Sequence, residues 1–416
     1  MKKWIAGILM CMVLISTMST ALYASEDVIQ VTEETVTEET VAEDTGTTDN
    51  GGKEEIIAPS AILIESTTGQ VLYEKDADEK RAPASVTKVM TLLLIFDALH
   101  EGRIQLQDEV PVSEYAASMG GSQVFLEVGE TQTVDTMIKC IAVASANDAC
   151  VAMSEFISGS ETEFVNQMNK RAEGLGMEHT HFVNCNGLDA EGHLTTARDI
   201  ALMSRELILK YPEIHDYSMI WMENITHKTA KGESEFGLTN TNKLVRQYEY
   251  ATGLKTGSTN EAKFCVSATG RKNDVELIAV IMAAPDSKTR FLDAIHLMNS
   301  GFGKCQLYKD TPKEKLEKIK ITNGVADSLN CEYSGDFEYV DTTGSNLGAV
   351  TAKNKMKKNI SAPIEKGKKV GSRVYSLDGE TIGELPIVAS DTINKAKFKD
   401  YLLKAFRCVL PVKMVK

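Results

Sequence analysis

Apolar positions are densest around residues 81–96, which predict the entry into a helix that is apolar on nearly every side. Such a helix belongs in the middle of a domain rather than on its surface. Pro83 suits the helix start, because its missing N–H is not needed there and its φ is already helical. Ser85 then lies in the first turn, and Lys88, three positions later, lies on the same face, roughly 5–6 Å away.

The periodicity alternates between strand and helix on both sides of this segment. Residues 58–74 predict two strands joined at a Thr-Gly turn, a hairpin. Further helices are predicted at residues 134–143, 149–157, 164–175, 195–209 and 290–300, and further strands at residues 253–256, 263–269 and 276–283. Together these elements predict one domain of mixed α and β structure over residues 56–305.

The pattern changes after Cys305. Between residues 312 and 390, short strand-like stretches alternate with turns at Asn323-Gly324, Thr343-Gly344 and Asp378-Gly379. This alternation predicts a separate small all-β domain.

Residues 391–416 return to helical spacing. Basic residues outnumber acidic ones by seven to two, and one face is apolar: Phe398, Tyr401, Leu402, Ala405, Phe406 and Val409. A basic amphipathic helix of this kind suggests an anchor at a membrane surface. The alternative is that this helix packs on the protein's own β domain.

The N-terminus has the pattern of a secretory signal peptide. Lys2-Lys3 precedes an apolar run and then small residues that end at Ala24, so residues 1–24 are predicted to be removed after Ala24, or alternatively after Ala21. The protein is therefore expected to be exported, to the outer face of the cytoplasmic membrane or the cell wall.

The formal net charge of the 416-residue chain is −14, but most of it lies in one segment. Residues 26–55 contain eleven acidic residues and one lysine. Residues 25–55 are therefore predicted to be a disordered, self-repelling acidic linker. The remaining composition, with 43% hydrophobic and 25% charged residues overall, is ordinary for a globular protein, and no basic stripe indicates nucleic-acid binding.

Cysteines and histidines give no metal pattern. Seven cysteines remain after the signal peptide, an odd number without regular spacing, which favours buried free thiols over a disulfide framework. His179, His181 and His193 could form a zinc cluster, but hydrogen-bonding or surface histidines are the favoured interpretation.

Ser85 and Lys88 are the first candidates for chemistry. A lysine in an apolar interior loses its preference for the charged form and becomes a proton acceptor. A serine beside it, at the positive end of a helix, is then a candidate nucleophile. Because Ser-x-x-Lys occurs by chance in many chains, this pair alone favours the ordinary interpretation, a first-turn serine and a solvated lysine.

Two more polar motifs follow in order. They are Ser145-Ala146-Asn147, between two predicted helices, and Lys255-Thr256-Gly257, on a predicted strand. With Ser85-x-x-Lys88 they resemble the motif set of penicillin-binding proteins and class A β-lactamases, with Ala146 where that set has Asp. The chain more specifically resembles the serine D-alanyl-D-alanine carboxypeptidases, which are low-molecular-mass penicillin-binding proteins.

The resemblance runs from about Ile56 to the C-terminus. Beyond the three motifs it rests on Phe182, Asn184, Gly187-Leu188-Asp189, His193, Thr195-Thr196-Ala197-Arg198-Asp199, Asn240-Thr241-Asn242-Lys243-Leu244 and residues 253–259. It implies an α/β (α+β) domain of the serine β-lactamase/transpeptidase type, with an antiparallel sheet and a helical subdomain. A small β-sandwich and the C-terminal amphipathic helix would follow.

The resemblance also implies a mechanism without metal or organic cofactor. Ser85 would attack the carbonyl of the terminal D-Ala-D-Ala bond of a peptidoglycan stem peptide and form an acyl-enzyme. Neutral Lys88 would take the hydroxyl proton, and Ser145 would relay a proton to the leaving amine. β-Lactam antibiotics such as penicillin would be covalent inhibitors at the same serine.

Substrate binding is implied for the remaining motif residues. Asn147 would hold the substrate amide, with a helix N-cap as its alternative role. Lys255 and Thr256 would meet the substrate carboxylate, and Gly257 would let substrate backbone approach the strand. The N–H groups of Ser85 and Ser258 would form the oxyanion hole. Arg290 is either near the carboxylate site or structural.

Two departures and three alternatives stay open. Thr241 stands where some relatives place a carboxylate-binding Arg, and Lys263 replaces a small residue. An endopeptidase or transpeptidase would use the same acylation, and a non-catalytic cell-wall scaffold would keep the fold. A class A β-lactamase is disfavoured, because no Glu-x-x-Leu-Asn run follows the second motif.

Overall fold

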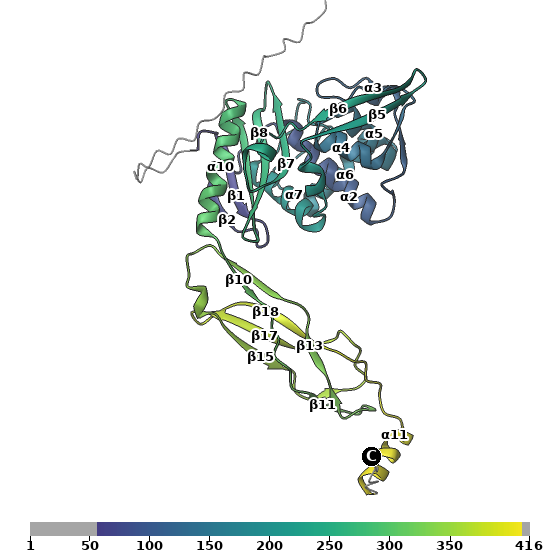
Figure 1. Cartoon of the computed structure of the whole chain (residues 1–416), viewed down its shortest axis with the longest axis vertical. Coiled ribbons are helices and arrows are strands. Elements are labelled where there is room, and N and C mark those ends of the chain that lie inside the picture. Colours follow the sequence, from purple (N-terminus) through teal and green to yellow (C-terminus); the bar gives the residue numbers. More distant parts are fainter. Residues whose placement is uncertain (1–55, 410–416) are drawn as a thin grey trace, which may run out of the picture. The chain divides into compact units, whose positions relative to one another are not determined.

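A five-stranded antiparallel sheet forms the centre of the first domain (Figure 1). The computed structural model describes residues 56–409. In sheet order the strands are β2 (Val71–Lys75), β1 (Ser60–Glu65), β9 (Val275–Ala284), β8 (Lys263–Lys272) and β7 (Ala251–Thr259). The predicted hairpin and the three later predicted strands are all present, and β7, which carries Lys255, lies at the edge of the sheet.

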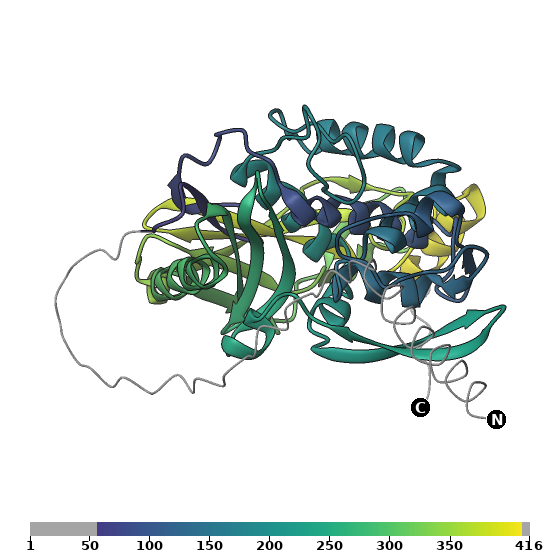
Figure 2. The same cartoon turned by 90° about the horizontal axis from the view of Figure 1, so that it is seen from above.

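The sheet is covered on both faces, which explains why β1 and β9 are apolar without alternation. Successive side chains of a strand point to opposite faces. Ile62 accordingly packs with the helices that precede β7, whereas Leu63 packs with α10 (Ser287–Lys304). Figure 2 shows α10 and the earlier helices on opposite sides of the sheet.

The predicted helices of this domain are present with small changes in their ends. Several begin at a side chain that accepts a backbone N–H, as at Thr133, Ser160 and Thr196. The helices are α2 (Lys88–His100), α3 (Glu114–Ala117), α4 (Val134–Ala142), α5 (Asn147–Ser158), α6 (Glu161–Gly174), α7 (Ala197–Lys210), α8 (Ile214–Ser218) and α9 (Leu244–Gln247). Two hairpins complete the domain, formed by β3 (Glu109–Pro111) with β4 (Thr131–Thr133) and by β5 (Met222–Thr229) with β6 (Gly232–Thr239).

The second domain is all-β, as its sequence pattern predicts. Its first strand, β10 (Gln306–Asp310), lies upstream of residue 312, where the sequence placed the domain start, because it pairs with β14 (Phe337–Asp341). A three-stranded sheet contains β12 (Ser328–Leu329), β11 (Ile319–Thr322) and β16 (Ile360–Ser361). A four-stranded sheet contains β13 (Cys331–Tyr333), β18 (Glu380–Ala389), β17 (Lys369–Leu377) and β15 (Thr351–Met356).

The last described element is the helix α11 (Phe398–Val409). Lys404 Nζ donates to the carbonyl of Gly324 and pairs with Asp327, so the helix touches the turn after β11. Within residues 56–409, no helix combines the length and apolarity needed to cross a bilayer. The predicted signal peptide, the acidic linker and residues 410–416 of the predicted anchor lie outside the described residues.

Candidate active site

Ser85 lies in one turn of 3₁₀ helix, Ala84–Thr87, that leads directly into α2. Ala84, just before it, has a positive φ of 48°, a conformation that a residue with a side chain rarely adopts. Strained backbone of this kind is concentrated at functional sites. The turn leaves Ser85 partly exposed while Lys88, the first residue of α2, is fully buried.

Lys88 joins three segments of the chain through its amine. Its Nζ lies 2.9 Å from Ser85 Oγ, 2.7 Å from Asn147 Oδ1 and 2.6 Å from the carbonyl oxygen of Asn186. The two carbonyl oxygens can only accept hydrogen bonds, whereas a serine hydroxyl can also donate one. A neutral amine has two N–H donors and one lone pair, so this geometry lets Lys88 donate to both carbonyls and accept from Ser85.

The surroundings of Lys88 favour that neutral state. Burial lowers its pKa from the usual 10.5, because the charged form loses its hydration. Its three hydrogen-bond partners are all uncharged, so none supplies the negative charge that would hold the proton. Lys88 is thus placed and prepared to accept a proton from Ser85.

Asn147 begins α5 and connects Lys88 to the loop before β4. Its Nδ2 donates to the carbonyl of Gly120 at 2.7 Å, which fixes the amide so that Oδ1 faces Lys88. The N-cap position is held by Ala146, without a side-chain cap, so the N-cap role considered for Asn147 is wrong. Ser145, two residues earlier, is buried and has a positive φ of 62°.

Lys255 and Thr256 lie on β7. Lys255 is buried, and its Nζ donates to the carbonyl of Thr256 at 3.0 Å. Burial lowers the pKa of Lys255 well below 10.5, and a proton on nearby Lys88 would lower it further, so the two amines disfavour being charged at the same time. The Thr256 hydroxyl shares a 2.8 Å hydrogen bond with the hydroxyl of Thr241.

Gly257 and Ser258 continue the same edge strand. A Cβ on Gly257 would lie 2.7 Å from the backbone nitrogen of Ser85 and 2.8 Å from that of Val86. Only glycine therefore lets β7 approach the nucleophile turn this closely. Ser258 follows as an exposed residue.

Arg290, from α10, is directed at the protein's own backbone. Its Nη1 donates to the carbonyls of Gly257 and Cys265, each at 3.1 Å, and its Nη2 donates to Ser287 Oγ at 3.1 Å. Burial lowers its pKa to about 10. The guanidinium thus ties α10 to β7 and β8 beside Gly257, which favours the structural alternative for this residue.

Comparison with known proteins gives the family. The sequence matches the model of the D-alanyl-D-alanine carboxypeptidase family over residues 45–286. Residues 303–395 match the C-terminal domain of penicillin-binding protein 5. The chain belongs to the D-alanyl-D-alanine carboxypeptidase family. It is thus a low-molecular-mass penicillin-binding protein with a C-terminal β domain.

Individual relatives agree with that assignment. The carboxypeptidase is 44% identical over 348 residues to D-alanyl-D-alanine carboxypeptidase DacF of Bacillus subtilis, which covers 83% of this chain and 88% of that protein. It is 31% identical over 369 residues to DacC of Escherichia coli, covering 83% and 88%. The crystal structure of penicillin-binding protein 5 from Haemophilus influenzae superposes with a TM-score of 0.65 at 27% identity, covering 84% of this chain and 100% of that one.

Several residues of this carboxypeptidase support the site although no role there could be predicted for them from the sequence. Asn186 supplies a carbonyl to Lys88, and Gly187 packs so closely on the nucleophile turn that a Cβ would lie 2.0 Å from the carbonyl oxygen of Ala84. The available signal was the turn-rich run of residues 184–189. A backbone carbonyl carries no residue-type signature, so its role could not be assigned from that run.

His193 is the third such residue. Its Nδ1 accepts the N–H of Val183 at 2.9 Å, so Nε2 carries the proton and donates to Thr87 Oγ1 at 2.8 Å. The Thr87 hydroxyl in turn donates to the carbonyl of Ala84 at 2.8 Å. Burial lowers the pKa of His193 to about 4, so the ring is neutral at pH 7. His193 therefore has a hydrogen-bonding role in this structure.

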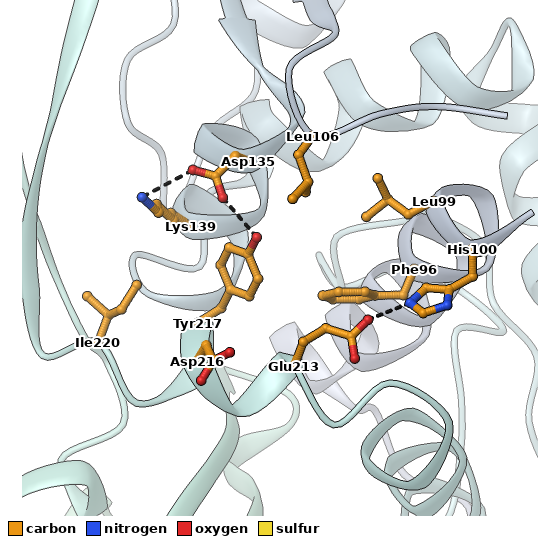
Figure 3. Close-up of a pocket in the computed structure, with 10 residues that line it drawn as sticks. All are labelled: Phe96, Leu99, His100, Leu106, Asp135, Lys139, Glu213, Asp216, Tyr217 and Ile220. Atoms are coloured by element: carbon orange, nitrogen blue, oxygen red, sulfur yellow. Dashed lines mark hydrogen bonds and ion pairs between the residues drawn. The ribbon is translucent and has the colours of Figure 1, made fainter. Parts of the chain in front are cut away.

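A hollow of about 540 Å³ opens elsewhere in the same domain (Figure 3). Tyr217 donates to Asp135 Oδ1 at 2.8 Å, and Lys139 pairs with the same carboxylate at 3.2 Å. The lining residues are Phe96, Leu99, His100, Leu106, Asp135, Lys139, Glu213, Asp216, Tyr217 and Ile220. No residue of the three motifs lines this hollow, so it is separate from the candidate active site.

Proposed function

We propose that this serine D-alanyl-D-alanine carboxypeptidase acts on peptidoglycan stem peptides with Ser85 as its nucleophile. Ser85 Oγ attacks the carbonyl carbon of the terminal D-Ala-D-Ala bond, an ester forms, and the last D-Ala leaves as a free amino acid. Water then hydrolyses the ester and restores Ser85. The observation that carries the proposal is the buried Lys88 amine, 2.9 Å from Ser85 Oγ and held by two carbonyl acceptors.

Proton transfer follows from the same contacts. Neutral Lys88 takes the Ser85 proton as the C–O bond forms, which makes the hydroxyl an effective nucleophile. The proton then has to reach the nitrogen of the departing D-Ala, and Ser145, two residues before Asn147, is the proposed relay. For deacylation the direction reverses, with Lys88 or Ser145 taking the proton of the attacking water.

The substrate is proposed to lie along β7, the edge strand of the five-stranded sheet. An extended peptide gains main-chain hydrogen bonds at a free sheet edge, and Gly257 keeps that edge close to Ser85. The N–H groups of Ser85 and Ser258 would bind the oxyanion, with Asn147 on the substrate amide. Lys255 and Thr256 would meet the terminal carboxylate, whose negative charge favours the protonated form of Lys255.

Penicillin is proposed to acylate the same serine. Its strained amide presents a carbonyl to Ser85, and its carboxylate would take the place of the substrate's terminal carboxylate near Lys255 and Thr256. The leaving nitrogen stays attached to the acyl group, so the adduct persists and labels the protein covalently.

Export and membrane association are proposed from the two ends of the chain. The N-terminal pattern of residues 1–24 supports export. In α11 the apolar side chains Phe398, Tyr401, Leu402, Leu403 and Phe406 are all exposed, with Phe398 at 83%. Burying that apolar face in the headgroup region would hold the protein at the outer face of the cytoplasmic membrane.

The test of the nucleophile compares the mature wild type with Ser85→Ala and with Ser300→Ala, an exposed serine in α10. Wild type and Ser300→Ala should release D-Ala from a peptide ending in D-Ala-D-Ala and bind labelled penicillin covalently. Ser85→Ala should lose both by roughly 10³-fold or more. Release of an internal fragment would favour an endopeptidase, and transfer of the acyl group to an added amine would favour a transpeptidase. A wild type without either activity would favour a scaffold.

The test of the anchor is a truncation after Lys397. The truncated protein should move from the membrane fraction to the soluble fraction while its penicillin acylation is unchanged. An unchanged distribution would show that α11 packs on protein instead.

A further inference from the structure

Five exposed lysines gather at one end of the β domain, in two segments that are distant in sequence. Lys357 and Lys358 follow β15, whereas Lys366 and Lys368 precede β17, which begins at Lys369. The N–H of Lys357 donates to the carbonyl of Val370 at 2.8 Å, so the two segments lie side by side. We name these residues the lysine cluster: Lys357, Lys358, Lys366, Lys368 and Lys369.

The charge of the lysine cluster is largely uncompensated. Lys369 pairs with Glu384 at 3.6 Å. Within residues 56–409, the other four lysines form no salt bridge. Glu365 is the single acidic residue of the two segments. The cluster therefore presents a net positive surface to solvent.

Protection of a sheet edge does not account for this placement. Lysines on an edge strand discourage pairing with another chain, and Lys353 and Lys355 on the edge strand β15 fit that role. Lys357, Lys358, Lys366 and Lys368 instead lie in the connections beyond the strand ends. The lysines of the cluster that lie outside the strands therefore need another explanation.

The lysine cluster lies at the end of the domain from which α11 leaves. Ile364 and Ile393 exchange backbone hydrogen bonds, and the N–H of Lys366 donates to Thr392 Oγ1 at 3.0 Å, so this segment runs beside the chain that enters α11. In the neighbouring strands, β16 pairs with β11, whose following turn contacts Lys404. Figure 1 shows β11 and α11 at this end of the β domain.

We propose that the lysine cluster is a second membrane-binding surface, which takes the phosphate groups of anionic phospholipids. This inference rests on the membrane association of α11 proposed above. The apolar face of one short helix gives limited binding, and further basic residues at the same surface add electrostatic attraction to anionic lipids. Lysines near an anionic bilayer each add attraction that fades within a Debye length, so the cluster must lie at the surface to contribute.

The experiment measures sedimentation of the full mature chain with vesicles of phosphatidylcholine, alone or with 30% phosphatidylglycerol. The cluster variant changes Lys357, Lys358, Lys366 and Lys368 to Gln. The matched control changes four exposed catalytic-domain lysines, Lys80, Lys170, Lys228 and Lys288, to Gln. Both variants should keep the wild-type rate of penicillin acylation, which shows that they fold.

The cluster variant should bind phosphatidylglycerol vesicles about tenfold or more weakly than the control, and this difference should vanish on pure phosphatidylcholine and at 1 M salt. Equal binding of the two variants would overturn the inference. Truncation after Lys397 tests the helix separately, since wild-type binding by the truncated chain would overturn the α11 anchor. Binding of soluble poly(glycerol phosphate) is measured on the same proteins. If the cluster variant loses this binding but still binds vesicles as the wild type does, the lysines bind a wall polymer, and the membrane proposal is overturned.

Discussion

Gly257 packs against Ser85 so closely that a side-chain Cβ on Gly257 would lie 2.7 Å from the Ser85 backbone nitrogen. That nitrogen is one of the two proposed oxyanion donors, and Gly257 lies on the strand edge proposed to bind the substrate. The close approach at Gly257 therefore helps to set the position of the nucleophile turn relative to the proposed substrate strand. Changes that move β7 should alter the chemistry at Ser85.

Gly257→Ala tests that contact. Because the added methyl group would meet the backbone nitrogens of Ser85 and Val86, either β7 or the nucleophile turn must shift. We expect the rate of penicillin acylation to fall by about 10²-fold, the cost of a displacement near 1 Å at a reacting centre. Gly303→Ala is the control, because a Cβ there meets nothing within 4 Å. Wild-type acylation in Gly257→Ala would show that the contact relaxes without effect.

Asn147→Asp should raise the pKa of the catalytic base. It replaces a neutral carbonyl 2.7 Å from Lys88 Nζ by a carboxylate, whose negative charge favours the protonated amine and raises its pKa. The rise of acylation with pH should therefore move to higher pH, so that acylation is lost on the acid side and recovers as the pH is raised. The measurement is the pH profile of acylation, and Asn147→Ala is the comparison, with a fall but no alkaline shift. An unshifted profile in Asn147→Asp would argue against Lys88 as the base.

His193 should make the folded state sensitive to mild acid. Its pKa is about 4 in the folded protein and 6.5 in the unfolded chain, so between these values the unfolded chain binds more protons. The free energy of unfolding should therefore decrease as the pH falls from 6.5 to 4, by up to about 3 kcal/mol from this residue. Urea unfolding at pH 7 and pH 4 should show a smaller difference between the two pH values in His193→Gln than in the wild type. The same difference in both proteins would mean that other groups carry the acid sensitivity.

Arg290→Met distinguishes the two roles considered for this residue. As a structural residue it donates to the carbonyls of Gly257 and Cys265, and loss of these two buried hydrogen bonds from a charged group should lower the free energy of unfolding by roughly 1–3 kcal/mol. Thermal or urea unfolding measures this, with the exposed neighbour Lys288→Met as control. Unchanged stability together with a raised KM for a peptide ending in D-Ala-D-Ala would assign Arg290 to the substrate carboxylate.

Much of the fold follows from local patterns in the sequence. The hairpin of β1 and β2, the buried helix α2 and the central strand β9 were all predicted, because apolar periodicity and turn residues act over a few positions. Local sequence patterns predict the start of the second domain less well. β10 is recognised as its first strand by pairing with β14, which lies about thirty residues later, and local periodicity does not reveal such a pairing.

The sequence by itself placed Ser85 and Lys88 three positions apart on one helix and indicated the three motifs in order, because that spacing is a local property of the chain. Tertiary structure alone decided what surrounds the amine of Lys88. Asn147, 59 positions away, and the carbonyl of Asn186, 98 positions away, meet it only when α2, α5 and the segment before α7 pack together. The protonation of a buried lysine depends on those distant partners and on the water they exclude, and neither is encoded in its neighbours along the chain.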